Sequence, residues 1–241
     1  MTRFCTLAAI FIAAAAIAGC TVSDRMASGS LHNPPSPPAQ QMNGDNVAKK
    51  SAAQIFMFRG GFNGIFSTGI TDMAEELRRR GIPAQDLSWA ASNSSLSKIK
   101  QAYVRNPNAG PIILAGHSLG AGSVISMAYE LTRAGITVDL VIVFDPLGAT
   151  SVPKGVRKLV NFKASGNKVN QGGFRPGKGF DGRIVNVDIR NLPELSKASH
   201  WNIVNQQALQ DQVFREIEET YWNWGSQDAP GRNAVPQPQN P

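Results

Sequence analysis

The sequence predicts an α/β domain in which a mostly parallel sheet is flanked by helices. Short apolar segments alternate with longer amphipathic segments between residues 54 and 224. This alternation is typical of parallel strands joined by right-handed crossover connections. Residues 138–144 are almost wholly apolar, as expected of a central strand covered on both faces. The chain has 241 residues, 42% of them hydrophobic, which is enough for one domain with a sizeable core.

Each expected strand is a short apolar segment bounded by polar or turn-forming residues. We expect strands at 55–58, 84–89, 112–115, 138–144, 158–162 and 183–189. The helices follow from apolar residues spaced three or four positions apart, and we expect them at 70–80, 95–104, 121–134 and 203–222. In the first helix the acidic residues come before the arginines, which complements the helix dipole. Gly81 and Gly135 follow two of these helices as C-terminal caps.

The most informative motif is the pentapeptide Gly116-His117-Ser118-Leu119-Gly120. It lies between an apolar strand and a helix that begins at Ala121. A Gly-x-Ser-x-Gly sequence between a strand and a helix is typical of a nucleophile elbow, a sharp turn that exposes the serine hydroxyl above the sheet. The sequence therefore predicts acyl chemistry at Ser118.

A nucleophilic serine needs a base, and the chain offers three histidines. His32 lies in a polar, proline-rich segment, and an elbow turns the side chain of His117 away from its neighbour Ser118. His200 precedes the last helix and follows the last strand. Its position corresponds to the carboxyl edge of the sheet, where active groups of parallel sheets lie. We therefore expect His200 to be the base.

The acid of a triad in this chain order lies between Ser118 and His200. Asp145 directly follows the apolar strand 138–144 and precedes a proline, so it is the first choice. Asp188 lies near the end of the last strand and is the alternative, and Glu194 in the histidine loop is weaker. The other acidic residues of this interval lie on a helix, at the wrong end of a strand or before a strand (Glu130, Asp139 and Asp181).

The tetrahedral intermediate of acyl transfer needs backbone N–H donors. One donor is expected from Leu119, the residue after the nucleophile. The other is expected from Gly61 or Phe62 in the glycine-rich loop that follows the first strand. Glycines let such a backbone approach closely and adopt unusual angles. The spacing of these glycines differs from that of a phosphate-binding P-loop, and no Lys-Ser or Lys-Thr pair follows them.

Together these motifs resemble those of the α/β-hydrolase superfamily of lipases, esterases and thioesterases. The resemblance covers residues 55–222. It departs from many members in two respects: Arg59-Gly60 stands where they carry His-Gly, and Asp145 lies one strand earlier than their acid. The resemblance implies a single compact domain without a large lid. It also implies hydrolysis of an ester or thioester through an acyl-enzyme.

The amino terminus resembles the signal of bacterial lipoproteins. Arg3 precedes an apolar run, which ends in Ile17-Ala18-Gly19-Cys20. The alternatives are a plain signal peptide and an uncleaved anchor. The resemblance implies a signal at 1–19 and lipidation at Cys20. Thr21 stands where inner-membrane lipoproteins of many Gram-negative bacteria have aspartate, which implies the periplasmic face of the outer membrane.

Polar, proline-rich segments flank the predicted domain. Residues 20–53 are expected to form a disordered tether, 54–224 the domain and 225–241 a disordered tail. Cys5 lies in the signal, so no disulfide is expected in the mature chain. The net charge is +7, but no basic run with interleaved aromatic residues indicates nucleic-acid binding.

The expected function is hydrolysis of a small-molecule or lipid-like acyl substrate by a monomeric enzyme that needs neither a cofactor nor a metal. Two alternatives remain open at this point. One is a transacylase that uses the same three residues. The other is a non-catalytic envelope lipoprotein that keeps the fold as a binding module.

Overall fold

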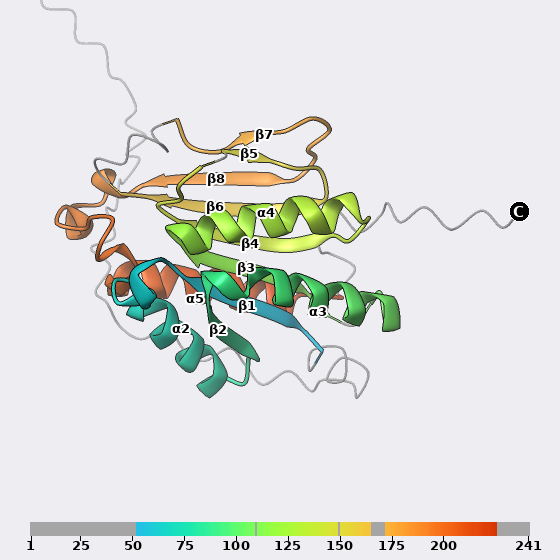
Figure 1. Ribbon diagram of the computed structural model, residues 1–241. Coiled ribbons are helices and arrows are strands. Elements are labelled where there is room, and N and C mark those ends of the chain that lie inside the picture. Colours follow the sequence, from blue (N-terminus) through green and yellow to red (C-terminus); the bar gives the residue numbers. More distant parts are fainter. Residues whose placement is uncertain (1–51, 109, 149, 165–171, 226–241) are drawn as a thin grey trace, which may run out of the picture. The chain divides into compact units, whose positions relative to one another are not determined.

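The computed structural model describes residues 52–108, 110–148, 150–164 and 172–225 (Figure 1). The predicted signal, Cys20, the tether up to residue 51 and the tail from residue 226 lie outside these ranges. Within them, no helix combines the length and the apolar character needed to cross a membrane.

The core of the fold is a six-stranded sheet in which all neighbouring strands are parallel, in the order β2-β1-β3-β4-β6-β8. The strands are β1 (Gln54–Arg59), β2 (Ala84–Ser88), β3 (Ile112–His117), β4 (Val138–Phe144), β6 (Val156–Lys163) and β8 (Arg183–Asp188). The chain moves outward from β1 to β2 and returns on the other side of β1 as β3. Ligands of such sheets bind beyond the carboxyl ends of the strands at this switch in direction.

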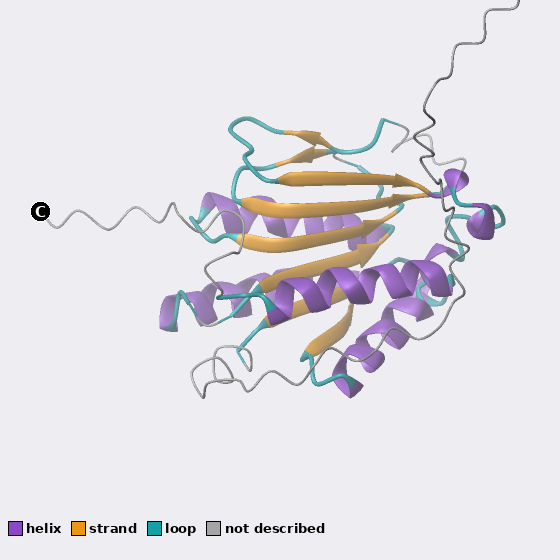
Figure 2. Cartoon of the chain, turned by 180° about the vertical axis from the view of Figure 1, so that it is seen from behind, coloured by secondary structure: helices purple, strands orange, loops and turns teal. Residues whose placement is uncertain are grey.

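Helices cover both faces of the sheet, as Figures 1 and 2 show from opposite sides. On one face lie α3 (Ser92–Arg105) and α4 (Leu119–Arg133); on the other lie α2 (Thr68–Arg79) and α5 (Gln207–Trp222). Side chains alternate between the two apolar layers along each strand. In β1, Ile55 and Met57 join the layer with α2 and α5, whereas Phe56 and Phe58 join the other. The predicted fold class is therefore confirmed.

Two parts of the fold differ from the sequence-based expectation. The last helix begins at Gln207, because residues 203–205 form a separate 3₁₀ turn. The apolar residues Ile203 and Val204, which suggested a longer helix, are fully buried in this turn. A small parallel sheet of β5 (Ser151–Val152) and β7 (Arg175–Pro176) was also not expected. Strands of two residues are too short to produce a periodic pattern.

The connection after β4 bears on access to the site. Among its described residues, the segment 145–155 contains only β5, and no helical lid is inserted there. The predicted domain without a large lid agrees with this arrangement.

Candidate active site

Ser118 lies in a strained turn between β3 and α4. Its backbone angles are φ 55° and ψ −117°, a conformation that costs a non-glycine residue about 1–3 kcal/mol. The two flanking glycines make the turn possible. A Cβ on Gly116 would lie 2.5 Å from backbone atoms of Gly120, and a Cβ on Gly120 would lie 2.3 Å from the carbonyl oxygen of Phe58. The pentapeptide therefore folds as the sharp turn that its glycine spacing predicts.

The structure brings Ser118, His200 and Asp145 together in one hydrogen-bonded chain. The Nε2 atom of His200 lies 3.0 Å from Ser118 Oγ. On the other side of the same ring, Nδ1 lies 2.6 Å from Asp145 Oδ2. A carboxylate can only accept, so Nδ1 carries the proton of the neutral ring and Nε2 is free to accept the serine proton.

Asp145 is fixed by its surroundings as well as by the imidazole. Its side chain is fully buried, and its second oxygen, Oδ1, accepts a hydrogen bond of 3.1 Å from the backbone N–H of Ala164. Its own N–H donates to Phe162, and its φ of 45° is positive. Both carboxylate oxygens are thus occupied, which satisfies a charge that would otherwise be costly to bury.

The alternative acids lie elsewhere. Asp188, at the end of β8, pairs with Lys163 Nζ at 3.2 Å. Glu194 is exposed in the 3₁₀ turn Pro193–Leu195. Of the three acids that the sequence left open, Asp145 is the one for which the structure records a hydrogen bond with His200.

The glycine-rich loop after β1 packs against the serine turn. A Cβ on Gly60 would lie 3.2 Å from Ser118 Cβ, and one on Gly61 would lie 3.0 Å from Leu119 Cδ1. The N–H of Gly60 donates to the hydroxyl of Ser67 at 3.0 Å, so it is already used. The expected donors Gly61, Phe62 and Leu119 therefore lie in the two segments that meet beside Ser118. Phe62 is held at φ 51°.

Sequence reasoning missed a second polar pair beneath the site. Ser67 and His117 are each 1% exposed, and Ser67 Oγ lies 2.8 Å from His117 Nδ1. The other ring nitrogen, Nε2, lies 2.8 Å from the carbonyl oxygen of His200. Because that carbonyl can only accept, Nε2 carries the proton and Ser67 donates to Nδ1. The elbow does turn His117 away from Ser118, but it turns the ring toward the backbone of the expected base.

This pair requires an uncharged His117. Burial, and to a smaller extent the nearby His200, lower the pKa of His117 from its ordinary 6.5 to about 4. His117 is therefore neutral at pH 7 and can accept the hydroxyl proton of Ser67. A histidine inside an apolar strand was the available sequence signal, since buried polar side chains are nearly always hydrogen-bonded.

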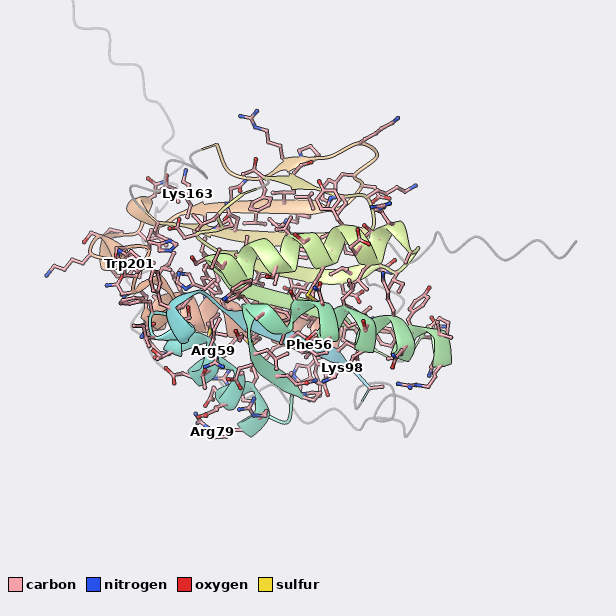
Figure 3. All side chains as sticks on the ribbon, viewed as in Figure 1. Phe56, Arg59, Arg79, Lys98, Lys163 and Trp201 are labelled. Carbon is pink, nitrogen blue, oxygen red and sulfur yellow. The ribbon has the colours of Figure 1, made fainter. Side chains whose placement is uncertain are left out.

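Exposed apolar side chains lie in the loops that carry the site residues. We call Phe62, Ile65, Phe66, Leu119, Leu147 and Trp201 the apolar rim. Phe62 is 72% exposed and Trp201 52%, and the rings of Phe62, Phe66 and Trp201 contact one another. The Trp201 ring also meets His200 edge-on. Figure 3 shows Trp201 at the edge toward which the strands of Figure 1 point.

No model of a protein family matches the chain, and no curated protein matches it. A solved structure from Xanthomonas campestris pv. campestris, assigned to the alpha/beta superfamily of hydrolases, is similar at 16% identity and a TM-score of 0.35. The match covers 66% of this chain and 99% of that chain. The sheet order, the two helix layers and the turn between β3 and α4 are consistent with a compact α/β-hydrolase fold.

Proposed function

We propose that this protein is a serine hydrolase that cleaves a carboxylic ester or thioester with an apolar acyl group. The observation that carries the proposal is the hydrogen-bonded chain from Ser118 Oγ through His200 to Asp145. A serine hydroxyl is a weak nucleophile at neutral pH. An imidazole that is oriented by a buried carboxylate is the arrangement that activates it.

In the first half of the reaction, His200 Nε2 accepts the hydroxyl proton as Ser118 Oγ attacks the carbonyl carbon. The negative oxygen of the tetrahedral intermediate faces the N–H of Leu119 and that of Gly61 or Phe62. The intermediate collapses, and the C–O or C–S bond breaks. The leaving alcohol or thiol takes the proton from His200, and the acyl group remains on Ser118.

In the second half, water replaces the alcohol. His200 accepts a proton from the water as its oxygen attacks the acyl carbon. The second intermediate releases the carboxylic acid, and the proton on His200 returns to Ser118. Throughout both halves Asp145 holds the ring and stabilises its positive charge.

The apolar rim supports an uncharged acyl group. The segments 60–68, 118–123 and 199–207 carry no lysine, arginine, aspartate or glutamate. Side chains that are both large and apolar are exposed there (Phe62, Ile65 and Trp201 above all). An exposed apolar patch of this kind indicates a binding surface. Leu119 follows the nucleophile in the chain, and the Trp201 ring meets the base His200 edge-on. We therefore expect this patch to hold the acyl chain of a bound ester.

Covalent labelling tests the proposed function. We expect a fluorophosphonate probe to label the wild-type protein and to leave Ser118→Ala unlabelled, because the probe reacts with activated serines. Circular dichroism of the variant would establish that it is folded. An unlabelled wild type, or label retained in Ser118→Ala, would contradict the proposal. A wild type that neither labels nor turns over any ester would favour the non-catalytic binding module.

The dependence on acyl chain length tests the substrate class. A fully buried methylene contributes about 0.8 kcal/mol, or about fourfold, and we expect roughly twofold on a half-exposed rim. The kcat/KM for p-nitrophenyl octanoate should then exceed that for the butyrate by about 16-fold. Trp201→Ala should reduce this ratio, whereas Val104→Ala, an exposed apolar residue outside the apolar rim, should not. Equal ratios in wild type and Trp201→Ala would exclude the apolar rim as the binding surface for the acyl chain.

A transacylase would share the first half-reaction and differ in the acceptor. Product analysis in the presence of a simple alcohol separates the two activities. The proposed hydrolase releases mainly the free acid. A predominant new ester would assign the site to acyl transfer instead.

A further inference from the structure

Ser67 and His117 connect the two segments that must meet at the reacting carbonyl. Ser67 Oγ accepts from the N–H of Gly60, at the start of the loop that carries Gly61 and Phe62. It donates to His117 Nδ1. His117 Nε2–H donates to the carbonyl oxygen of His200. The three hydrogen bonds are between 2.8 and 3.0 Å long.

We infer that Ser67 and His117 are positioning residues. They hold the loop that carries Gly61 and Phe62, and the loop that carries His200, in place beside Ser118. This inference rests on the proposed hydrolase function. Because both side chains are buried and hydrogen-bonded to other groups, we expect neither to contact the substrate. Each acts through a backbone group: Ser67 through the amide of Gly60, and His117 through the carbonyl of His200. Both are buried, so water does not compete for these hydrogen bonds.

The backbone geometry explains why such a connection is needed. Phe62 and Ser118 both have positive φ, and strained positions persist only where their surroundings hold them in place. The segment 189–206, which carries His200, contains three short 3₁₀ turns and no longer element. Hydrogen bonds to Ser67 and His117 therefore hold these loops in place, where regular secondary structure does not.

Loss of the connection should affect the rate more than substrate binding. The amides of Gly61 and Phe62 matter most when the carbonyl oxygen becomes negative, so their displacement raises the barrier without weakening the ground-state complex. A displacement of about 1 Å costs on the order of 100-fold in rate. We expect Ser67→Ala to lower kcat by about 10- to 100-fold, with KM within about twofold of wild type.

The test counts active sites with the fluorophosphonate probe and divides the turnover of p-nitrophenyl butyrate by that count. This normalisation removes the effect of unfolded protein. Ser95→Ala is the matched control, because Ser95 is also 1% exposed and its hydroxyl has no hydrogen-bond partner within the described residues. His117→Gln keeps one acceptor and one donor and should restore most of the rate lost in His117→Leu.

Three outcomes are distinguishable. A lower kcat per titrated site in Ser67→Ala, but not in Ser95→Ala, supports the inference. Equal kcat per titrated site in the two variants overturns it while leaving the hydrolase function intact. A wild-type protein that neither labels nor turns over the ester overturns the proposed function, and this inference with it. The double variant Ser67→Ala/His117→Leu should lose little more than either single variant, because both break the same connection.

Discussion

Replacement of Asp145 by asparagine should lower kcat for ester hydrolysis by about 10⁴-fold. The backbone N–H of Ala164 donates to Oδ1, and it would keep the asparagine oxygen in that place. The amide NH₂ would then face His200 Nδ1 and donate to it. The ring proton would move to Nε2, which lies 3.0 Å from Ser118 Oγ. A protonated Nε2 cannot accept the serine proton, so the base would be lost although its position is retained.

Asp188→Asn is the control for this prediction. Asp188 also lies at the carboxyl end of a strand, as the last residue of β8, but it pairs with Lys163. We expect its substitution to change kcat by less than about threefold, as for a charge pair outside the reacting groups. Steady-state kinetics with p-nitrophenyl butyrate measures both variants. A large loss in Asp188→Asn with little loss in Asp145→Asn would show that the acid has been assigned to the wrong strand.

Acidification should destabilise the folded protein through His117. Its pKa is 6.5 when unperturbed and about 4 in the folded chain, so between these values the unfolded chain binds more protons. The free energy of unfolding therefore falls as the pH falls below about 6.5, and this loss is complete near pH 4. A difference of this size corresponds to about 3 kcal/mol over the whole interval, a large part of the stability of a typical domain.

Urea unfolding at several pH values between 7 and 4.5 measures this effect. His117→Gln has no titrating group at this position, so its free energy of unfolding should fall less steeply with acid than that of the wild type. The difference between the two slopes isolates His117 from the other titrating residues. Parallel curves for the two proteins would mean that His117 is not held neutral in the folded state.

The fold was predictable because its signals are local and repeated. An apolar segment such as 138–144 has the length of a strand and the composition of a doubly covered one, and the structure places β4 at those residues. The start of α5 was not predictable in the same way. Ile203 and Val204 fit a helical pattern, yet they are buried in a turn that packs on α2, where a Cβ on Gly69 would lie 2.1 Å from Val204 O. Tertiary packing decided that boundary.

Part of the candidate site could likewise be predicted from the sequence, and part could not. Elimination singled out His200 from the sequence, since the chain has three histidines and one of them follows the last strand. Asp145 and Asp188 both lie at the carboxyl ends of strands. The structure was needed to show that Asp145 is the one that pairs with His200. The Ser67–His117 pair could not be inferred from spacing. The two residues are 50 positions apart, and nothing in either segment indicates the other.

The three non-glycine residues with positive φ are Phe62, Ser118 and Asp145, among the residues that the structure describes. They lie in the loop after β1, in the turn after β3 and directly after β4. Glycine at Ser118 would relieve the backbone strain there, at a gain of about 1 kcal/mol. A selection for heat resistance that ignored turnover would therefore favour Ser118→Gly, a variant more stable than the wild type but inactive. At this position, a gain in stability would cost the proposed activity.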